Sequence, residues 1–103
     1  MGQCCAEFDI WEANREAEVM TSHPCTREGY FTCQGNDCEW NGVCDKGGCG
    51  VNPYLMNNRN FYGKGSQFTV DTSKPFTVVT QFLTNDGTDH GHVVDIRRHY
   101  VQN

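Results

Sequence analysis

The sequence predicts an all-β fold with long irregular loops. Apolar and polar residues alternate with a period of two near the start of the chain and again over its last third, as in strands that bury one face. The best helix formers lie at Ala13 to Met20, but this stretch lacks the apolar stripe of an amphipathic helix, so we expect a turn or an extended segment. The middle of the chain is rich in Gly, Asn, Asp and Cys, which is typical of loops.

The N-terminal half is predicted to contain one strand followed by loops. The strand covers Gln3 to Trp11. Residues His23 to Gly50 are expected to form a long loop, which needs ties such as cysteine cross-links because a long loop has high conformational entropy. Asn52 to Gly65 continues the irregular region.

Three further strands are predicted in the C-terminal part, at Gln67 to Asp71, Phe76 to Leu83 and His92 to Gln102. The Asp86-Gly87 and His90-Gly91 pairs mark a connection longer than a two-residue turn, so the last two strands are expected to form a hairpin. The chain shows neither an internal repeat nor a second domain.

Three carboxylates lie within six residues of the first predicted strand: Glu7, Asp9 and Glu12. In a regular strand Glu7 and Asp9 share one face and Glu12 falls on the other. One extra residue at Ile10–Trp11, a β-bulge, would return Glu12 to the first face, and bulges are common beside active sites. Because like charges on one face repel, this arrangement suits a site that needs several carboxyl groups, the alternative being an exposed acidic strand without chemistry. Glycoside hydrolysis is the reaction that most plainly needs two.

The residues around these carboxylates, from Cys4 to Asn14, resemble the catalytic signature of glycoside hydrolase family 7, the retaining cellulases of fungi and protists. The resemblance continues over essentially the whole chain, at His23-Pro24-Cys25, Asn52-Pro53-Tyr54, Phe61-Tyr62-Gly63-Lys64-Gly65, Val70-Asp71-Thr72, Phe76 to Phe82 and Tyr100-Val101-Gln102-Asn103. It implies a curved antiparallel β-sandwich of the concanavalin-like jelly-roll type, with the cleft on the concave face. Residues 1–103 are then expected to be part of a catalytic domain that is incomplete at both ends, since catalytic domains of the family are several times longer.

The resemblance also implies roles for individual residues. Glu7 matches the nucleophile, Glu12 matches the general acid/base, and Asp9 matches a residue that hydrogen-bonds the nucleophile and tunes its charge. His23 matches a histidine near the acid/base, where it would help to position and charge-balance Glu12. Three acids this close cannot all ionise at low cost, so we expect Glu12 to keep its proton near neutral pH.

The implied function is hydrolysis of β-1,4-glucosidic bonds in cellulose with retention of configuration, without a metal or other cofactor. A β-glucanase acting on mixed-linkage or β-1,3-glucan is one alternative, and a non-catalytic extracellular carbohydrate-binding module is another. A binding module has no use for mutually repelling carboxylates, and an inactive relative would carry Gln, Ser or Asn at position 7 or 12. The short segment between Cys38 and Cys44, and Leu55 in place of an arginine of the family, favour an endoglucanase over a cellobiohydrolase.

All seven cysteines lie within the first 49 residues. Cys4 and Cys5 are neighbours on a predicted strand, where side chains point to opposite faces, so they suit bonds to two separate segments better than a bond to each other. The family resemblance implies two internal disulfides, Cys25–Cys44 and Cys33–Cys38. It places the partners of Cys4, Cys5 and Cys49 outside these residues. Zinc binding is the alternative, although the cysteine spacing fits it only marginally.

Composition narrows the setting of the protein. A net charge of −5 argues against nucleic acid as a partner and leaves a neutral polysaccharide open. No apolar run reaches the roughly 18 residues of a transmembrane helix, so no membrane contact is expected. The cysteine density suggests a secreted, extracellular protein. No signal peptide is visible, so the chain is expected to be an internal piece of a longer secreted protein, and a monomer.

Several other side chains have two possible readings. Trp40, in a loop rich in Gly and Asn, is a candidate sugar-stacking platform, whereas Trp11 is expected to pack in the core behind the carboxylates. His90 and His92 are expected to be solvated loop residues rather than metal ligands. Residues 97–99 (Arg-Arg-His) are expected to form a mixed solvent and rim face of the last strand.

Overall fold

The computed structural model describes residues 2–103 and, within them, all side chains except those of Gln3 and Cys4. Secondary structure in this range is almost entirely β, as predicted. The elements are β1 (Gly2–Cys4), β2 (Glu7–Ala13), β3 (Glu18–His23), β4 (Phe31–Cys33), the 3-10 turn η1 (Gly35–Cys38), β5 (Cys49–Val51), β6 (Tyr62–Gly63), β7 (Val70–Asp71), β8 (Thr77–Thr84) and β9 (Val93–Val101).

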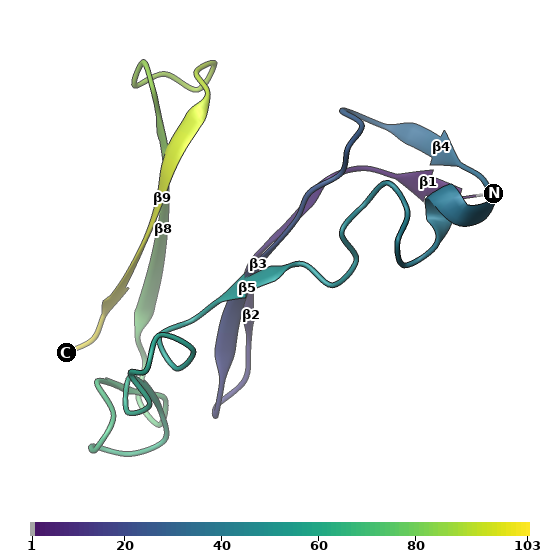
Figure 1. Ribbon diagram of the computed structural model, residues 1–103. Coiled ribbons are helices and arrows are strands. Elements are labelled where there is room, and N and C mark those ends of the chain that lie inside the picture. The colour runs from purple at the N-terminus through teal and green to yellow at the C-terminus, as the bar shows by residue number, and fades with distance from the viewer. Residues whose placement is uncertain (1) are drawn as a thin grey trace.

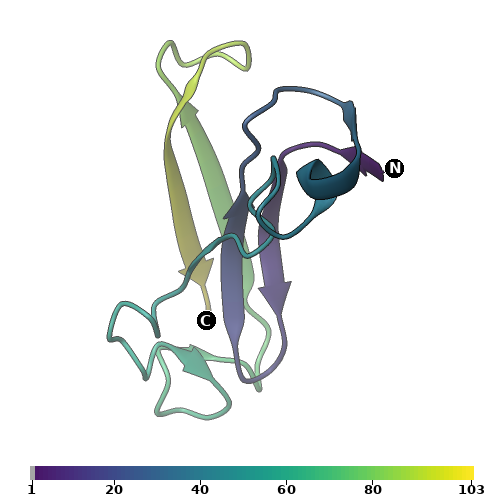
Figure 2. The same cartoon turned by 45° about the vertical axis from the view of Figure 1, so that its right-hand side comes forward.

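Two antiparallel sheets form two layers. In the first, β3 lies between β2 and β5, and in the second, β8 and β9 form a hairpin. Figure 1 shows the hairpin beside the three-stranded sheet, with the segment between β5 and β8 at the bottom of the view. In Figure 2 the strands of the two sheets run in nearly the same direction, which is the aligned packing of β-sandwiches.

Aromatic side chains connect the two layers. Phe8 of β2 meets Phe82 of β8 edge to face, with ring centroids 5.7 Å apart. Trp11 contacts Phe76 at 6.4 Å and Tyr100 at 6.1 Å, so it faces the second layer as predicted, but 37% of its surface stays exposed. The packing is nevertheless incomplete, because Phe82 remains 43% exposed. An apolar sheet face needs a covering layer, and this architecture is that of a fragment of a β-sandwich.

The first strand differs from the prediction, because the chain changes partners at Cys5 and Ala6. Instead of one strand over residues 3–11, β1 pairs with β4 and β2 pairs with β3. Alternation alone could not show this break, since both halves keep an extended backbone. The short elements β4, η1 and β5 likewise interrupt the predicted loop 23–50.

The C-terminal hairpin confirms the prediction for the last two strands. Its register runs from Thr77 opposite Val101 to Thr84 opposite Val93. The predicted strand at 67–71 is wrong in extent, because only Val70 and Asp71 pair, in parallel, with β6. The residues before Val70 form turns instead, in which the Phe68 nitrogen donates to the Gly65 carbonyl.

The turn between β2 and β3 is built by Asn14. Its Oδ1 accepts hydrogen bonds from the nitrogens of Glu16 and Ala17, at 2.8 and 2.9 Å, which is the local capping that favours Asn in turns. The Tyr62 hydroxyl donates to the Asn14 carbonyl at 2.8 Å, and the Thr72 hydroxyl donates to the Arg15 carbonyl at 2.7 Å. The predicted non-helical segment is therefore a turn held by residues from β6 onward.

Two disulfides tie the long loop. The structure joins Cys25 to Cys44 and Cys33 to Cys38, the two pairs that the family resemblance implies. Among the described side chains, those of Cys5 and Cys49 are free thiols and exposed. The Cys4 side chain lies outside the described residues.

A buried carboxyl group lies between the layers. Glu18, the first residue of β3, is only 6% exposed, and its Oε1 atom has no hydrogen-bond partner. Burial raises the pKa of Glu18, while the Tyr100 hydroxyl and the Arg98 charge partly oppose the shift. Because the raised pKa favours the protonated form in the folded state, the stability linked to Glu18 is present below its ordinary pKa and is lost as pH rises through the folded pKa.

We expect the Glu18→Gln variant to lose this pH dependence, because the amide cannot ionise. Its melting temperature should exceed that of the unsubstituted protein by several degrees at about pH 7 and by little at about pH 4. Thermal unfolding at the two pH values measures the difference. A constant difference between the two proteins across this range would show that Glu18 stays in one protonation state.

Candidate active site

The three carboxylates of β2 lie on one face of the sheet because the strand contains a β-bulge. Glu7 is paired with His23, Asp9 with Thr21 and Glu12 with Val19. Between Asp9 and Glu12, β2 has two residues where β3 has one, and the register shifts there. The extra residue returns Glu12 to the side of Glu7 and Asp9, which confirms the bulge predicted at Ile10–Trp11.

The neighbouring Asp9 raises the pKa of Glu7. The carboxyl of Asp9 hydrogen-bonds to that of Glu7, and this contact is the main cause that raises the pKa of Glu7; repulsion by the Asp9 and Glu12 charges adds to it. A hydrogen bond between two carboxyl groups requires one of them to carry the proton. The proton expected on Glu12 stays a prediction, and the group whose pKa is raised by its neighbours is Glu7.

His23 completes a line of polar groups behind these two acids. Its Nε2 lies 3.2 Å from Oδ2 of Asp9, and its Nδ1 lies 2.8 Å from the carbonyl oxygen of Asp45. A carbonyl can only accept, so Nδ1 must carry a hydrogen. In the charged form of the imidazole Nε2 carries a hydrogen as well and can donate it to Oδ2 of Asp9.

The pKa of His23 is raised, first by the Asp45 carbonyl and then by the negative charges of Asp9 and Glu7. A charged His23 in turn lowers the pKa of Glu7 and offsets part of the repulsion in the acid pair. His23 was expected to support Glu12. The contact that the structure shows is with Asp9, because the cross-strand register sets His23 opposite Glu7 at the other end of the acidic face.

The loop that supplies the Asp45 carbonyl is fixed by the first disulfide. Cys25 and Cys44 are bridged and also form an isolated β-bridge, and the Asp45 nitrogen donates to the Pro24 carbonyl at 2.9 Å. Sequence reasoning missed Asp45. The signal was present, because the implied disulfide joins the residue two after His23 to the residue before Asp45.

Gly48 was missed as well. Its φ of +69° lies in the left-handed region, and a Cβ atom there would come within 2.6 Å of the His23 ring. Only glycine meets both conditions without strain. The close approach of this backbone keeps the imidazole against Asp9.

The acidic face is open. Glu7 and Glu12 are exposed, whereas the side chains of Asp9 and His23 keep 23% and 20% of their surface exposed. The carboxyl groups of Glu7 and Glu12 are therefore accessible to a ligand. The less exposed Asp9 and His23 both influence the pKa of Glu7. Trp40 is 67% exposed in the loop after η1, with its indole beside Gly47, and its role in sugar stacking stays a prediction.

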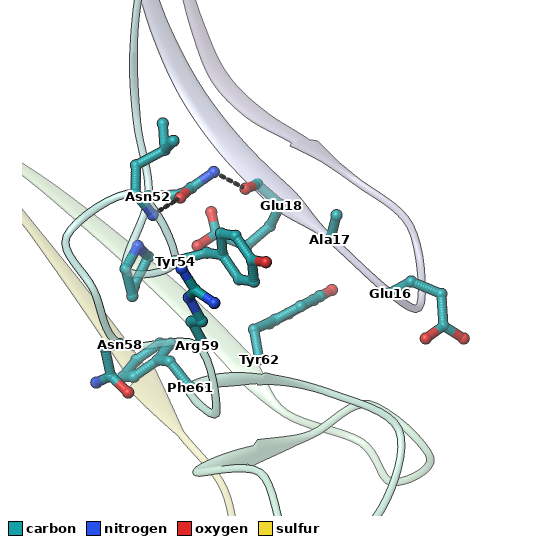
Figure 3. Close-up of a pocket in the computed structure, with 11 residues that line it drawn as sticks. Glu16, Ala17, Glu18, Asn52, Tyr54, Asn58, Arg59, Phe61 and Tyr62 are labelled. Carbon is teal, nitrogen blue, oxygen red and sulfur yellow. Dashed lines mark hydrogen bonds between the residues drawn. The ribbon is translucent and has the colours of Figure 1, made fainter.

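A separate cavity of about 280 Å³ lies on the other face of β3, where alternation along the strand places Glu18 opposite to Val19 and His23. Figure 3 shows Glu18, Tyr54, Phe61 and Tyr62 around it, with Asn52 donating to the Glu18 carbonyl at 3.0 Å. The lining is mainly apolar and contains none of the three β2 carboxylates. We therefore assign the chemistry to the acidic face.

Among the side chains that the structure describes, which exclude that of Cys4, no group of His, Cys, Asp and Glu is arranged to hold a metal ion. His90 is almost fully exposed beside Asp89. None of the helices in the described range has the length and apolar character to cross a membrane. The acidic face is thus the candidate site that combines closely spaced titrating groups with access for a ligand.

The chain resembles known proteins over its whole length. Residues 1–103 match the sequence model of glycosyl hydrolase family 7. The endo-beta-1,4-glucanase celB of Aspergillus oryzae is 52% identical over 103 residues, which are 100% of this chain and 24% of that protein. The chain therefore spans about a quarter of the length of the curated relatives that it matches.

Solved structures agree on the fold. The native endocellulase EGI of Humicola insolens superposes with a TM-score of 0.88 at 50% identity, over 99% of this chain and 25% of that one. A family 7 cellobiohydrolase from Daphnia pulex gives a TM-score of 0.88 at 51% identity, over 99% of this chain and 24% of that one.

Proposed function

Because this chain belongs to glycosyl hydrolase family 7, we propose that it forms the catalytic part of a secreted cellulase that hydrolyses β-1,4-glucosidic bonds with retention of configuration. Residues 1–103 are then part of one catalytic domain, whose remaining strands cover the exposed apolar faces. The observation that carries this proposal is the bulge in β2, which turns Glu12 to the side of Glu7. Two carboxyl groups facing one bond are what a retaining glycosidase requires.

In the proposed reaction Glu7 attacks the anomeric carbon while Glu12 donates its proton to the leaving oxygen. Attack requires Glu7 to be ionised, although the neighbouring Asp9 carboxyl raises its pKa. The charged form of His23 supports this state by lowering the pKa of Glu7. Glu12 then removes a proton from water, which releases the sugar from Glu7 and restores both groups.

The polysaccharide is proposed to be cellulose. The curated relatives are named endo-beta-1,4-glucanases, and one solved relative is described as an endoglucanase complexed with cellobiose. The short segment after Cys38 and the presence of Leu55 support an open cleft and an endoglucanase. The Daphnia pulex relative is a cellobiohydrolase of similar identity, so the mode of cleavage has to be measured.

The stereochemical outcome tests the mechanism. The two layers bury little on their own, so we place residues 1–103 within a complete catalytic domain, in a chimera where they replace the matching segment of the Humicola insolens endocellulase. Proton NMR during hydrolysis of cellotetraose should show the β-anomer first. Initial release of the α-anomer would identify an inverting enzyme and would require carboxyls about 6.5–9.5 Å apart instead of about 5–5.5 Å.

The same chimera tests the substrate. It should release reducing sugars from carboxymethylcellulose and amorphous cellulose, and far less from the β-1,3-glucan laminarin. Preference for laminarin would favour the alternative β-glucanase. Binding of cellotetraose without hydrolysis would favour a non-catalytic module.

A further inference from the structure

Arg98 of β9 joins the two layers at the bulge. Its Nε donates to the Thr80 hydroxyl of β8 at 2.8 Å. Its Nη2 reaches across to the other layer and donates to the Ile10 carbonyl of β2, and it also contacts the sulfur of Met20 at 3.4 Å. The guanidinium lies over the Trp11 ring, with 5.3 Å between its carbon and the ring centroid. The expectation that Arg98 belongs to a mixed solvent and rim face is therefore wrong.

The carbonyl that Arg98 holds belongs to the bulge itself. Ile10 and Trp11 are the two residues of β2 without a register partner on β3. A bulge leaves such backbone groups outside the regular ladder, so their hydrogen-bond partners must come from elsewhere. Arg98 supplies the donor at Ile10 and covers the side chain of Trp11. Both contacts act on the segment that separates Asp9 from Glu12.

Two further residues, Tyr100 and Thr80, restrict the guanidinium of Arg98. Tyr100, two residues further along β9, places its hydroxyl oxygen 3.5 Å from Nη1 of Arg98. Thr80 fixes Nε on the strand opposite. An arginine with partners on three sides has little freedom, so it can impose a position on the Ile10 carbonyl.

We propose that Arg98 is a positioning residue for the reaction: by holding the bulge at Ile10 it keeps the Glu12 carboxyl on the face of Glu7. This inference rests on the proposed function, because it assigns a consequence to the orientation of Glu12 as acid/base. Arg98 reaches β2 from the core face of the sheet and does not itself contact the substrate. If the bulge relaxes, Glu12 turns away while Glu7 and Asp9 keep their regular pairing with β3.

The test is the Arg98→Met variant of the chimera, because methionine keeps much of the apolar stem and removes the donor. The values of kcat/KM report formation of the glycosyl-enzyme and are compared for cellotetraose and for 2,4-dinitrophenyl cellobioside. Cellotetraose needs a proton from Glu12, whereas dinitrophenolate leaves without one. We expect a loss of about 10- to 100-fold on cellotetraose, the scale of a 1 Å misplacement, and a loss below about threefold on the aryl substrate.

Arg97→Met is the matched control. Arg97 is the neighbour on β9, points to the opposite face and pairs with Asp95 on the surface, 2.8 Å away. It should change neither rate. Arg98→Lys covers the case in which the methionine variant fails to fold, since lysine keeps the charge beside Glu18 but cannot bond Ile10 and Thr80 together. It should show the same selectivity with a smaller loss, of about three- to tenfold.

A stability effect is separated by the double variant Glu18→Gln/Arg98→Met. Replacing Arg98 leaves the buried Glu18 charge without a partner, and the second substitution removes that charge. The melting temperature of the double variant should therefore recover, while the selective loss on cellotetraose should persist. Equal losses on the two substrates, or no loss on either, would overturn the positioning role. An unsubstituted chimera that hydrolyses neither substrate would contradict the proposed function itself, which is a different result.

Discussion

The Glu7→Gln variant is expected to lose turnover by about 10⁴-fold or more, because the amide cannot form the glycosyl-enzyme bond. Sugar binding should stay close to that of the unsubstituted chimera, since glutamine has the same shape and keeps a hydrogen-bonding group beside Asp9. The loss should also be the same for substrates with good and poor leaving groups. A nucleophile is needed in every turnover, whatever group departs.

Steady-state hydrolysis of cellotetraose and of 2,4-dinitrophenyl cellobioside measures the loss, and calorimetric titration with cellotetraose measures binding. Glu16→Gln is the matched control, since Glu16 is an exposed glutamate in the turn after β2, away from the acidic face. It should keep full activity. Turnover above about 1% of the control by Glu7→Gln would reassign the nucleophile.

The position of Glu12 could be predicted from the sequence because it depends on parity alone. Glu7 and Asp9 are two residues apart and Glu12 is three further on, so a single inserted residue is enough to unite them. The hairpin near the C-terminus was predictable for a similar reason. Its two strands are long, alternate regularly and are separated by residues that favour turns.

The partner of His23 could not be predicted in the same way. It depends on the register between β2 and β3, on the disulfide that holds Asp45, and on the absence of a side chain at Gly48. These features come from three segments of the chain. The raised pKa of Glu7 has a different origin, because the neighbouring Asp9 raises it by more than the charge of His23 lowers it.

Arg98 shows a second limit of sequence reasoning. It lies between Arg97 and His99, and this polar run suggests a solvated strand face. Alternation nevertheless places Arg98 with Ile96 and Tyr100 on the inner face of β9, opposite to Arg97. Its partner, the Ile10 carbonyl, is a backbone atom, and only the path of the bulge exposes it to the guanidinium. No residue type in the sequence encodes that contact.

Glu12→Gln is expected to lower the hydrolysis rate selectively, according to the leaving group, whereas Glu7→Gln should lower it equally for all substrates. Hydrolysis of cellotetraose should fall by about 10³-fold in kcat/KM, because the sugar alkoxide is a poor leaving group without a proton. With 2,4-dinitrophenyl cellobioside, kcat/KM should change by less than about tenfold, whereas kcat should fall much further. In that case Glu7 is glycosylated normally, and the intermediate accumulates because no base activates the water.

Azide distinguishes this mechanism from general damage to the site. It is already an anion and needs no base, so it should attack the glycosyl-enzyme, break the bond to Glu7 and restore kcat for the aryl substrate by about 10-fold or more. The product should be the β-configured cellobiosyl azide, since two inversions at the anomeric carbon give net retention. Azide should have no effect on Glu7→Gln, where no intermediate forms. Equal losses on both substrates, together with no response to azide, would show that Glu12 is not the acid/base, and the purpose of the bulge in β2 would have to be sought elsewhere.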